Sequence, residues 1–481
     1  MKLGKRLLAV VLAMLMVIGI TGCGGGSDET ANGETKLLWY VIGSKQRDME
    51  SVMTEFNNRV KEKLGFTVDI QVIDAGTYTD KMNMIISSGE NFDMCFTSSW
   101  SNDFLKNAKN GAFYALDELL AEEQDFYNSI PEYTWNSARI DGQIMAVPNY
   151  QSYTYYEAAA IPKRFIDKYN VDVESIHNLQ DLEPYFEQIK ANEQGIYPLD
   201  PKGFNMQTQI YYGTGAPGVG VIDKDADGKV YSIYESEEYM QKLATMRDYY
   251  KKGYIRPDVV SAAGEEATNT VKYGCWRAQA GPGSAATLSD KYGEEIVEIS
   301  LVEEPVLSNA GARATMTAVS RTSKHPKEAL QLIKLLNEDK DLYNLIYFGI
   351  EGKHYEKLDE DTVKIIEDGG YINATGFAYG SQFNSYYIEG QEDDLWKKAD
   401  ELNRSARVMF LDGFQLNTDS IKTEVANLSA VEKEYSYLLY GAEDYEDAQK
   451  EFVEKLKSAG LEKTMTEVQN QINDFMASKN Q

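Results

Sequence analysis

The chain has 481 residues, with 48 Lys plus Arg against 76 Asp plus Glu, and its formal net charge is −28 at pH 7. This acidic balance argues against nucleic acid and against anionic membrane surfaces as partners, because both are bound through clustered Lys and Arg. The three histidines, His177, His325 and His354, have no His or Cys at ligand spacing, so we expect no metal and no cofactor. At roughly 100 to 200 residues per domain, the length predicts two or three domains.

The N-terminus has the pattern of an export signal. Three basic residues precede an apolar run over 7–20 that is too short to span a membrane comfortably. The run leads into ITGC at 20–23, which resembles the bacterial lipobox, whose cysteine is lipidated on sulfur and becomes the new N-terminus after cleavage. We therefore predict a signal peptide over 1–22, a lipid on Cys23 and a flexible tether over 23–35, which places the protein on the outer face of the cytoplasmic membrane. A plain secretory signal is the alternative.

Strand and helix patterns alternate over the next sixty residues. Apolar runs predict buried strands over 37–42, 66–73 and 92–97. Between them, apolar residues at spacings of three and four predict helices over 49–64 and 78–86. This alternation predicts an α/β lobe with a parallel sheet, in which ligands lie beyond the carboxyl ends of the strands.

The rest of the chain is more helical. The pattern predicts a helix over 237–252, strands over 271–280 and 314–320, and a further helix that starts within 323–329. Two amphipathic helices fill the last sixty residues. A glycine-rich stretch over 213–220 lacks the context of a phosphate-binding loop, so we expect a flexible loop there.

Two cysteines remain after the signal segment, Cys95 and Cys275, each in an apolar run typical of a strand. A disulfide would be stable outside the cell, but sequence gives no evidence that the two Cα atoms approach closely enough. Two buried free thiols are therefore the favoured prediction.

Three aspartates, Asp223, Asp225 and Asp227, have the spacing that opens a calcium loop. The glutamate that should close such a loop comes one residue late, and no clear helix precedes it. A polar turn is therefore favoured over a calcium site.

Several segments together resemble a known family. They are the lipobox, FDMCFTSSW, IDGQIMAVPNY, TAVSRTSKHPKEALQLIKLLN, FGIEGKHYEKL and LKSAGLEKTMTEVQNQINDF. They are similar to extracellular solute-binding lipoproteins of bacterial ABC importers, in the subgroup of aldouronate or oligosaccharide binders with a C-terminal domain of unknown function. The resemblance implies a bilobal fold of the periplasmic-binding-protein type, with two α/β lobes joined by crossing hinge segments.

The resemblance also implies a division of the chain into lobes. The N-terminal lobe would comprise 36–148 and 271–318. The C-terminal lobe would comprise 152–268 and 322–481, including the helical segment 400–481. The chain would then cross between lobes near 148–149, 268–270 and 319–320.

Candidate ligand-binding residues follow the predicted strand ends and the first crossing. Sugar recognition uses flat aromatic faces together with planar polar groups, and these positions supply both. The candidates are Lys45, Ser98, Ser99, Trp100, Asn149, Tyr150, Tyr153, Trp276 and Arg277. Trp100 and Trp276 would stack on sugar rings, and Arg277 could hold a uronate carboxylate. For each residue the alternative is packing in the core or a solvated charge, and His354 is expected to make a structural hydrogen bond.

The predicted function is capture of an oligosaccharide, with a uronate sugar as one option, and its delivery to the permease subunits of an ABC importer. The protein would act as a monomer, tethered to the membrane by lipid only, and would catalyse no reaction. One alternative is a surface glycosidase, although no pair of carboxylates stands out. Another alternative is a binding protein for peptides or another polar solute.

Overall fold

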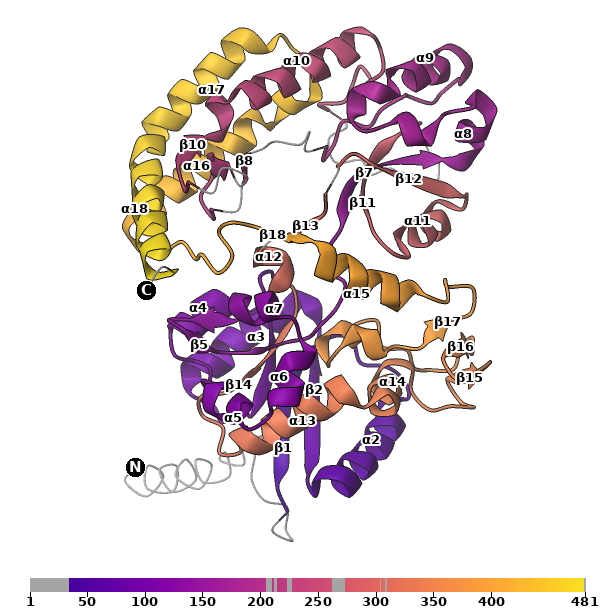
Figure 1. The fold of residues 1–481 in the computed structure, drawn as a ribbon, viewed down its shortest axis with the longest axis vertical. Coiled ribbons are helices and arrows are strands. Elements are labelled where there is room, and N and C mark those ends of the chain that lie inside the picture. Colours follow the sequence, from indigo (N-terminus) through magenta and orange to yellow (C-terminus); the bar gives the residue numbers. More distant parts are fainter. Residues whose placement is uncertain are drawn as a thin grey trace, which may run out of the picture.

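The computed structural model describes residues 34–204, 210–211, 214–222, 227–261, 273–302, 304–307 and 309–479. Within these residues the chain forms two α/β lobes, one above the other in Figure 1, joined by extended segments. The predicted bilobal fold is confirmed. Cys23, Asp223, Asp225 and the expected crossing near 268–270 lie outside the described residues.

The first lobe is built on a parallel core of three strands. The strands β1 (Lys36–Ile42), β2 (Thr67–Ile73) and β3 (Met94–Thr97) lie in the order β2-β1-β3, and the helices α2 (Met49–Leu64) and α3 (Ala75–Ser88) connect them. Both helices end at a glycine in the left-handed conformation, as the sequence indicates. The predicted alternation of strand and helix is confirmed, and the carboxyl ends of the three strands lie at one edge.

Two later strands complete this sheet. The strand β14 (Met316–Val319) runs antiparallel to β3, and β6 (Val147–Pro148) pairs with β14. Short elements lead to β6, and they are α4 (Phe104–Lys109), α5 (Asp117–Ala121), α6 (Gln124–Ser129), α7 (Glu132–Ser137), β4 (Arg139–Ile140) and β5 (Gln143–Ile144). The expected crossing near 319–320 therefore lies inside the first-lobe sheet, where Val319 pairs with Met94.

Residues 326–405 also pack onto the first lobe. The helices α13 (Pro326–Glu338) and α14 (Lys340–Phe348) contact α2, and their apolar faces share one core with β1. The other elements of this stretch are β15 (Tyr355–Lys357), β16 (Thr362–Ile365), β17 (Tyr387–Ile388) and α15 (Leu395–Ser405). The expectation assigned 322–481 to the C-terminal lobe as one piece; the packing divides that range near residue 406.

The second lobe has a three-stranded antiparallel sheet. The central strand β7 (Tyr156–Pro162) pairs with β11 (Trp276–Ala280) on one side and with β12 (Ile296–Ser300) on the other. The helices beside this sheet are α8 (Lys163–Tyr169), α9 (Glu183–Asn192) and α11 (Ser284–Tyr292). The expected placement of 271–318 in the first lobe therefore differs from the structure, because the backbone of β11 and β12 bonds to β7.

The C-terminal helices form a second layer of this lobe. Apolar side chains of α10 (Glu237–Lys251) and of the last three helices share a core with a small sheet. These elements are β8 (Ile210–Tyr211), β9 (Val219–Ile222), β10 (Val230–Ser232), α16 (Lys422–Tyr435), α17 (Tyr445–Ala459) and α18 (Leu461–Lys479). The predicted pair of amphipathic C-terminal helices corresponds to α17 and α18.

In the described part of the chain, the segments that connect the lobes lie within 149–155, 304–307 with 309–315, and 406–411. The second contains β13 (Val306–Leu307) and α12 (Asn309–Ala312), and β13 pairs with β18 (Arg407–Val408) of the third. Cys95 and Cys275 are buried free thiols in the cores of different lobes, which confirms the favoured prediction. Among the described helices none is long and apolar enough to cross a membrane.

Candidate functional site

A groove of about 740 Å³ lies between the two lobes, and we call it the interlobe groove. Its second-lobe wall includes Tyr156, Gly281, Pro282, Glu298 and Ser300. Its first-lobe wall is α15, through Lys398, Glu401, Leu402 and Ser405. In Figure 1 this helix lies directly below α11 and β12. The groove therefore has one wall on each lobe, so relative movement of the lobes would change its width.

Carboxylates dominate the charged groups of the groove. The Ser284 hydroxyl donates a hydrogen bond to one oxygen of Glu298. The other Glu298 oxygen is buried and has no hydrogen-bond partner within the described part of the chain. Burial raises the pKa of Glu298. Lys398, the only lysine among the described residues that line the groove, lies 2.7 Å from Glu392 and 2.9 Å from Asp394.

A buried amide fixes α15 to the first crossing segment. The Oδ1 atom of Asn403 accepts hydrogen bonds from the backbone N–H groups of Tyr153 and Thr154 at 3.0 and 3.1 Å. Its Nδ2 atom donates to the carbonyl of Gln151 at 2.7 Å. The Tyr150 hydroxyl donates to Asp400 at 2.7 Å. The predicted site residues Tyr150 and Tyr153 are thus buried, and they hold the first-lobe wall of the groove in place.

The predicted residue Asn149 is also fully buried. Its Oδ1 atom accepts a hydrogen bond from the Thr317 hydroxyl at 3.1 Å, and its carbonyl accepts one from Thr315. The Nδ2 atom lacks a partner among the residues the structure describes. Asn149 therefore lies buried at the junction of the first crossing with the first-lobe sheet.

An exposed aromatic ring does lie beside this groove. Tyr155, on the first crossing, is 41% exposed and rests against Gly281. A Cβ atom on Gly281 would come within 3.0 Å of the tyrosine ring, so glycine permits this close approach. Tyr155 therefore presents an exposed aromatic face beside the groove.

The loop after β3 places three predicted residues beside the second crossing. Ser98 is buried, and its hydroxyl accepts from the Ser101 N–H at 2.8 Å. The Ser99 N–H donates to the Arg313 carbonyl at 2.9 Å. The Trp100 ring is 56% exposed, while its Nε1 donates to the Ala314 carbonyl at 2.7 Å. Trp100 is therefore an oriented aromatic face that is open to solvent at the crossing.

The predicted pair on β11 is largely sequestered. Trp276 is 5% exposed and packs on Tyr292 at a ring distance of 4.7 Å. Arg277 makes two hydrogen bonds to the Glu157 carboxylate, at 2.8 and 3.0 Å. The structure therefore places Trp276 in the second-lobe core and binds Arg277 to its own lobe.

Lys45 is exposed and lines a different groove, of about 670 Å³, beside α3. The structure does not bring it together with the residues of the interlobe groove.

A buried lysine on α10, Lys242, was not predicted from the sequence, and it is 8% exposed. Burial lowers its pKa to about 8, although the Glu157 charge acts in the opposite direction. A lone lysine in a helix gives no signal of burial in the sequence.

The segment around His354 has the structural role that the sequence suggested. The Nδ1 atom of His354 accepts from the Ile350 N–H at 2.8 Å, and Nε2 lies 3.4 Å from Asp48. Burial lowers the pKa of His354, and Lys353, 2.7 Å away, helps to lower the pKa of Asp48 to about 2. These contacts join the start of α2 to the loop after α14.

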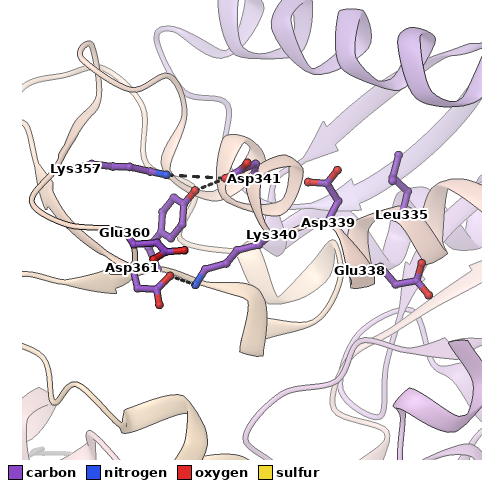
Figure 2. Close-up of a pocket in the computed structure, with 9 residues that line it drawn as sticks. Leu335, Glu338, Asp339, Lys340, Asp341, Lys357, Glu360 and Asp361 are labelled. Carbon is purple, nitrogen blue, oxygen red and sulfur yellow. Dashed lines mark hydrogen bonds and ion pairs between the residues drawn. The ribbon is translucent and has the colours of Figure 1, made fainter. Parts of the chain in front are cut away.

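A further groove, of about 640 Å³, opens on the first lobe alone (Figure 2). Its lysines are paired, Lys340 with Asp361 and Lys357 with Asp341 at 4.0 Å. Within the described ranges, no group of three or more His, Cys, Asp or Glu side chains is placed to hold a metal ion. Because its walls belong to one lobe, this groove is separate from the candidate site.

The fold and the interlobe groove are those of a two-lobed binding protein. A family model for bacterial extracellular solute-binding proteins matches residues 52–346, and one for a domain of unknown function (DUF3502) matches 410–477. The chain belongs to the bacterial extracellular solute-binding proteins. It is a binding protein and not an enzyme, as the sequence predicted.

Particular relatives are similar along most of the chain. A carbohydrate ABC transporter substrate-binding protein of Streptococcus pneumoniae is 27% identical over 99% of both chains. The polygalacturonan/rhamnogalacturonan-binding protein YtcQ of Bacillus subtilis is 18% identical over 74% of this chain and 75% of its own. The crystal structure of the N-glycan transport solute-binding protein NgtS from Streptococcus pneumoniae has a TM-score of 0.82 at 26% identity, covering 92% of this chain and 99% of that chain.

Structures of NgtS with bound glycans are less similar to this chain. The complex with Man1GlcNAc has a TM-score of 0.69, and the complex with Man5GlcNAc has 0.66, with the same coverage. All three structures are of the same protein, NgtS. The present structure therefore resembles the form described without a glycan.

Proposed function

We propose that the protein captures an oligosaccharide outside the cell and delivers it to the permease of an ABC importer. The observation that carries this proposal is the interlobe groove, whose volume of about 740 Å³ falls within the range of roughly 300 to 1,000 Å³ of ligand pockets. The glycan complexes of NgtS support an oligosaccharide as the ligand. The exposed rings of Tyr155 and Trp100 supply the apolar faces that sugar recognition uses.

Closure of the lobes would couple binding to transport. Lobes joined by short crossing segments move about them as rigid bodies, and ligand selects the closed form when it binds that form better. The lower similarity to the glycan-bound forms of NgtS supports an open state for the present structure. The Asn403 contacts keep α15 attached to the first crossing, so this wall of the groove would remain with the hinge.

Replacing Trp100 with alanine is expected to weaken binding of Man5GlcNAc about thirtyfold, because loss of an aromatic hot spot costs about 2 kcal/mol. The melting temperature should stay near the wild-type value, since the ring is 56% exposed. Titration calorimetry and thermal melting measure the two effects. Met84→Ala, which removes an exposed apolar side chain from the groove beside α3, is the matched control. Unchanged affinity in Trp100→Ala would exclude this residue from the site.

We also propose that a lipid on Cys23 anchors a monomer to the outer face of the membrane after removal of residues 1–22. Cys23→Ala should release the folded protein into the medium or wash fraction, because stable anchoring depends on the acyl chains. Membrane fractionation with a high-salt wash tests this. If the variant remains in the membrane pellet, the lipid is not what anchors the protein.

A further inference from the structure

The charge of the interlobe groove bears on which oligosaccharides it can accept. Glu298 contributes a carboxylate from the second lobe, and Glu401, whose Oε1 atom lies 3.8 Å from the Lys397 Nζ atom, contributes one from α15. Lys398 is the one cation that the described part of the chain places on these walls, and it lies within 3 Å of two carboxylates outside the groove, those of Glu392 and Asp394. The positive charge on the walls is therefore already compensated.

The Glu298 carboxylate has capacity for one more hydrogen-bond donor. Ser284 satisfies one oxygen, whereas the other is buried and meets no donor among the described side chains and backbone. A buried acceptor that has lost its water without gaining a partner is unfavourable, so a ligand donor that reached this oxygen would be favoured there. A sugar hydroxyl can donate to this oxygen, while an ionised uronate carboxylate is an acceptor only.

The nearby cations of the second lobe do not offset this preference. Both guanidinium contacts of Arg277 go to Glu157, at 2.8 and 3.0 Å. Lys242 is buried on α10, and Glu157 is the charge that acts on it. Neither cation belongs to the walls of the interlobe groove. Glu157 therefore forms the ion pair with Arg277 and is also the charge that acts on Lys242.

We infer that Glu298 and Glu401 make the interlobe groove select neutral, hydroxyl-rich oligosaccharides over those that carry uronate carboxylates. This inference rests on the proposed function and names the chemical class of its ligand. Two effects produce this selectivity. The carboxylates of Glu298 and Glu401 repel the carboxylate of a uronate sugar. The free oxygen of Glu298 accepts a hydrogen bond from a hydroxyl, which an ionised carboxylate cannot donate. The choice between neutral and acidic glycans is thereby assigned to two residues from opposite lobes.

The test compares two glycans that differ in charge. Binding of Man5GlcNAc is measured by calorimetry against the same glycan with its primary alcohols oxidised to carboxylates. The wild-type protein should bind the neutral glycan at least tenfold more tightly, in line with about 1.4 kcal/mol per tenfold change. Glu298→Gln keeps the size of the side chain and removes its charge, and Glu401→Gln does the same on the exposed helix. In each variant the ratio of the two dissociation constants should shift several-fold in favour of the oxidised glycan.

A control separates local from overall charge. Glu360→Gln makes the same change of charge in the first-lobe groove of Figure 2, away from the interlobe groove, and should alter neither affinity. Equal binding of the two glycans by the wild type, or an equal effect of Glu360→Gln, would overturn the inference and leave oligosaccharide capture intact. If neither glycan binds, the proposed function fails for this glycan class, and the inference fails with it.

Discussion

Replacing Trp276 with alanine is expected to lower the free energy of unfolding by about 3 to 5 kcal/mol, the range measured for truncation of large aromatic side chains in cores. The indole is 5% exposed and lies in a small cluster with Ala158, Ala160 and Tyr292. The two alanines are too short to fill the cavity that truncation would leave. Chemical unfolding of the variant and the wild type measures the difference.

Trp276→Phe is the informative companion of this variant. It keeps most of the ring volume and removes Nε1, which has no hydrogen-bond partner in the part of the chain that the structure covers. We expect Trp276→Phe to cost less than about 1.5 kcal/mol, as volume-conserving exchanges do. If Trp276→Ala instead kept its stability and lost glycan binding, the ring would belong to the site and not to the core.

The parallel core of the first lobe was predictable because its signals are local. The strand β1 is an unbroken apolar run, and α2 carries an apolar stripe that a left-handed glycine ends. Each signal lies within about fifteen residues of sequence. Strand β3 followed from the same reasoning, and with it the exposed position of Trp100 at a carboxyl end.

The division into lobes depends on pairings between distant segments, which periodicity does not report. β11 and β12 flank β7 although more than a hundred residues separate them from it. Likewise α13 shows a strong apolar face, but the sequence does not say which core that face covers. In the structure it covers the first lobe.

None of the nine residues predicted for the site is among the described residues that line the interlobe groove, and the neighbouring pair on β11 shows one reason. Trp276 and Arg277 are neighbours on one strand, so their side chains point to opposite faces and cannot both face one pocket. Trp276 faces Tyr292, whereas Arg277 faces Glu157. Glu298 and Glu401 were missed because the sequence has 76 Asp plus Glu, and nothing in it distinguishes these two carboxylates from the others. Only the folded structure shows that they line the same groove from opposite lobes.

Replacing Lys242 with methionine is expected to raise the free energy of unfolding at pH 7 by roughly 1 to 3 kcal/mol. Burial lowers the pKa of this lysine from 10.5 to about 8, and each pKa unit corresponds to about 1.4 kcal/mol, part of which packing of the new side chain will offset. Because the folded-state pKa lies below the unfolded one, the cost of the buried charge is complete below pH 8. It disappears as the pH rises toward 10.5.

The advantage of Lys242→Met should therefore shrink as the pH is raised. Urea unfolding of the variant and the wild type at pH 7 and at pH 9.5 measures this change. Lys251→Met, on the exposed side of the same helix, is the control and should shift stability by less than about 0.5 kcal/mol. A loss of stability in Lys242→Met at pH 7 would mean that the Glu157 charge stabilises the ammonium by more than burial costs. A gain in stability with glycan binding intact would instead identify Lys242 as a buried charge that the site does not use.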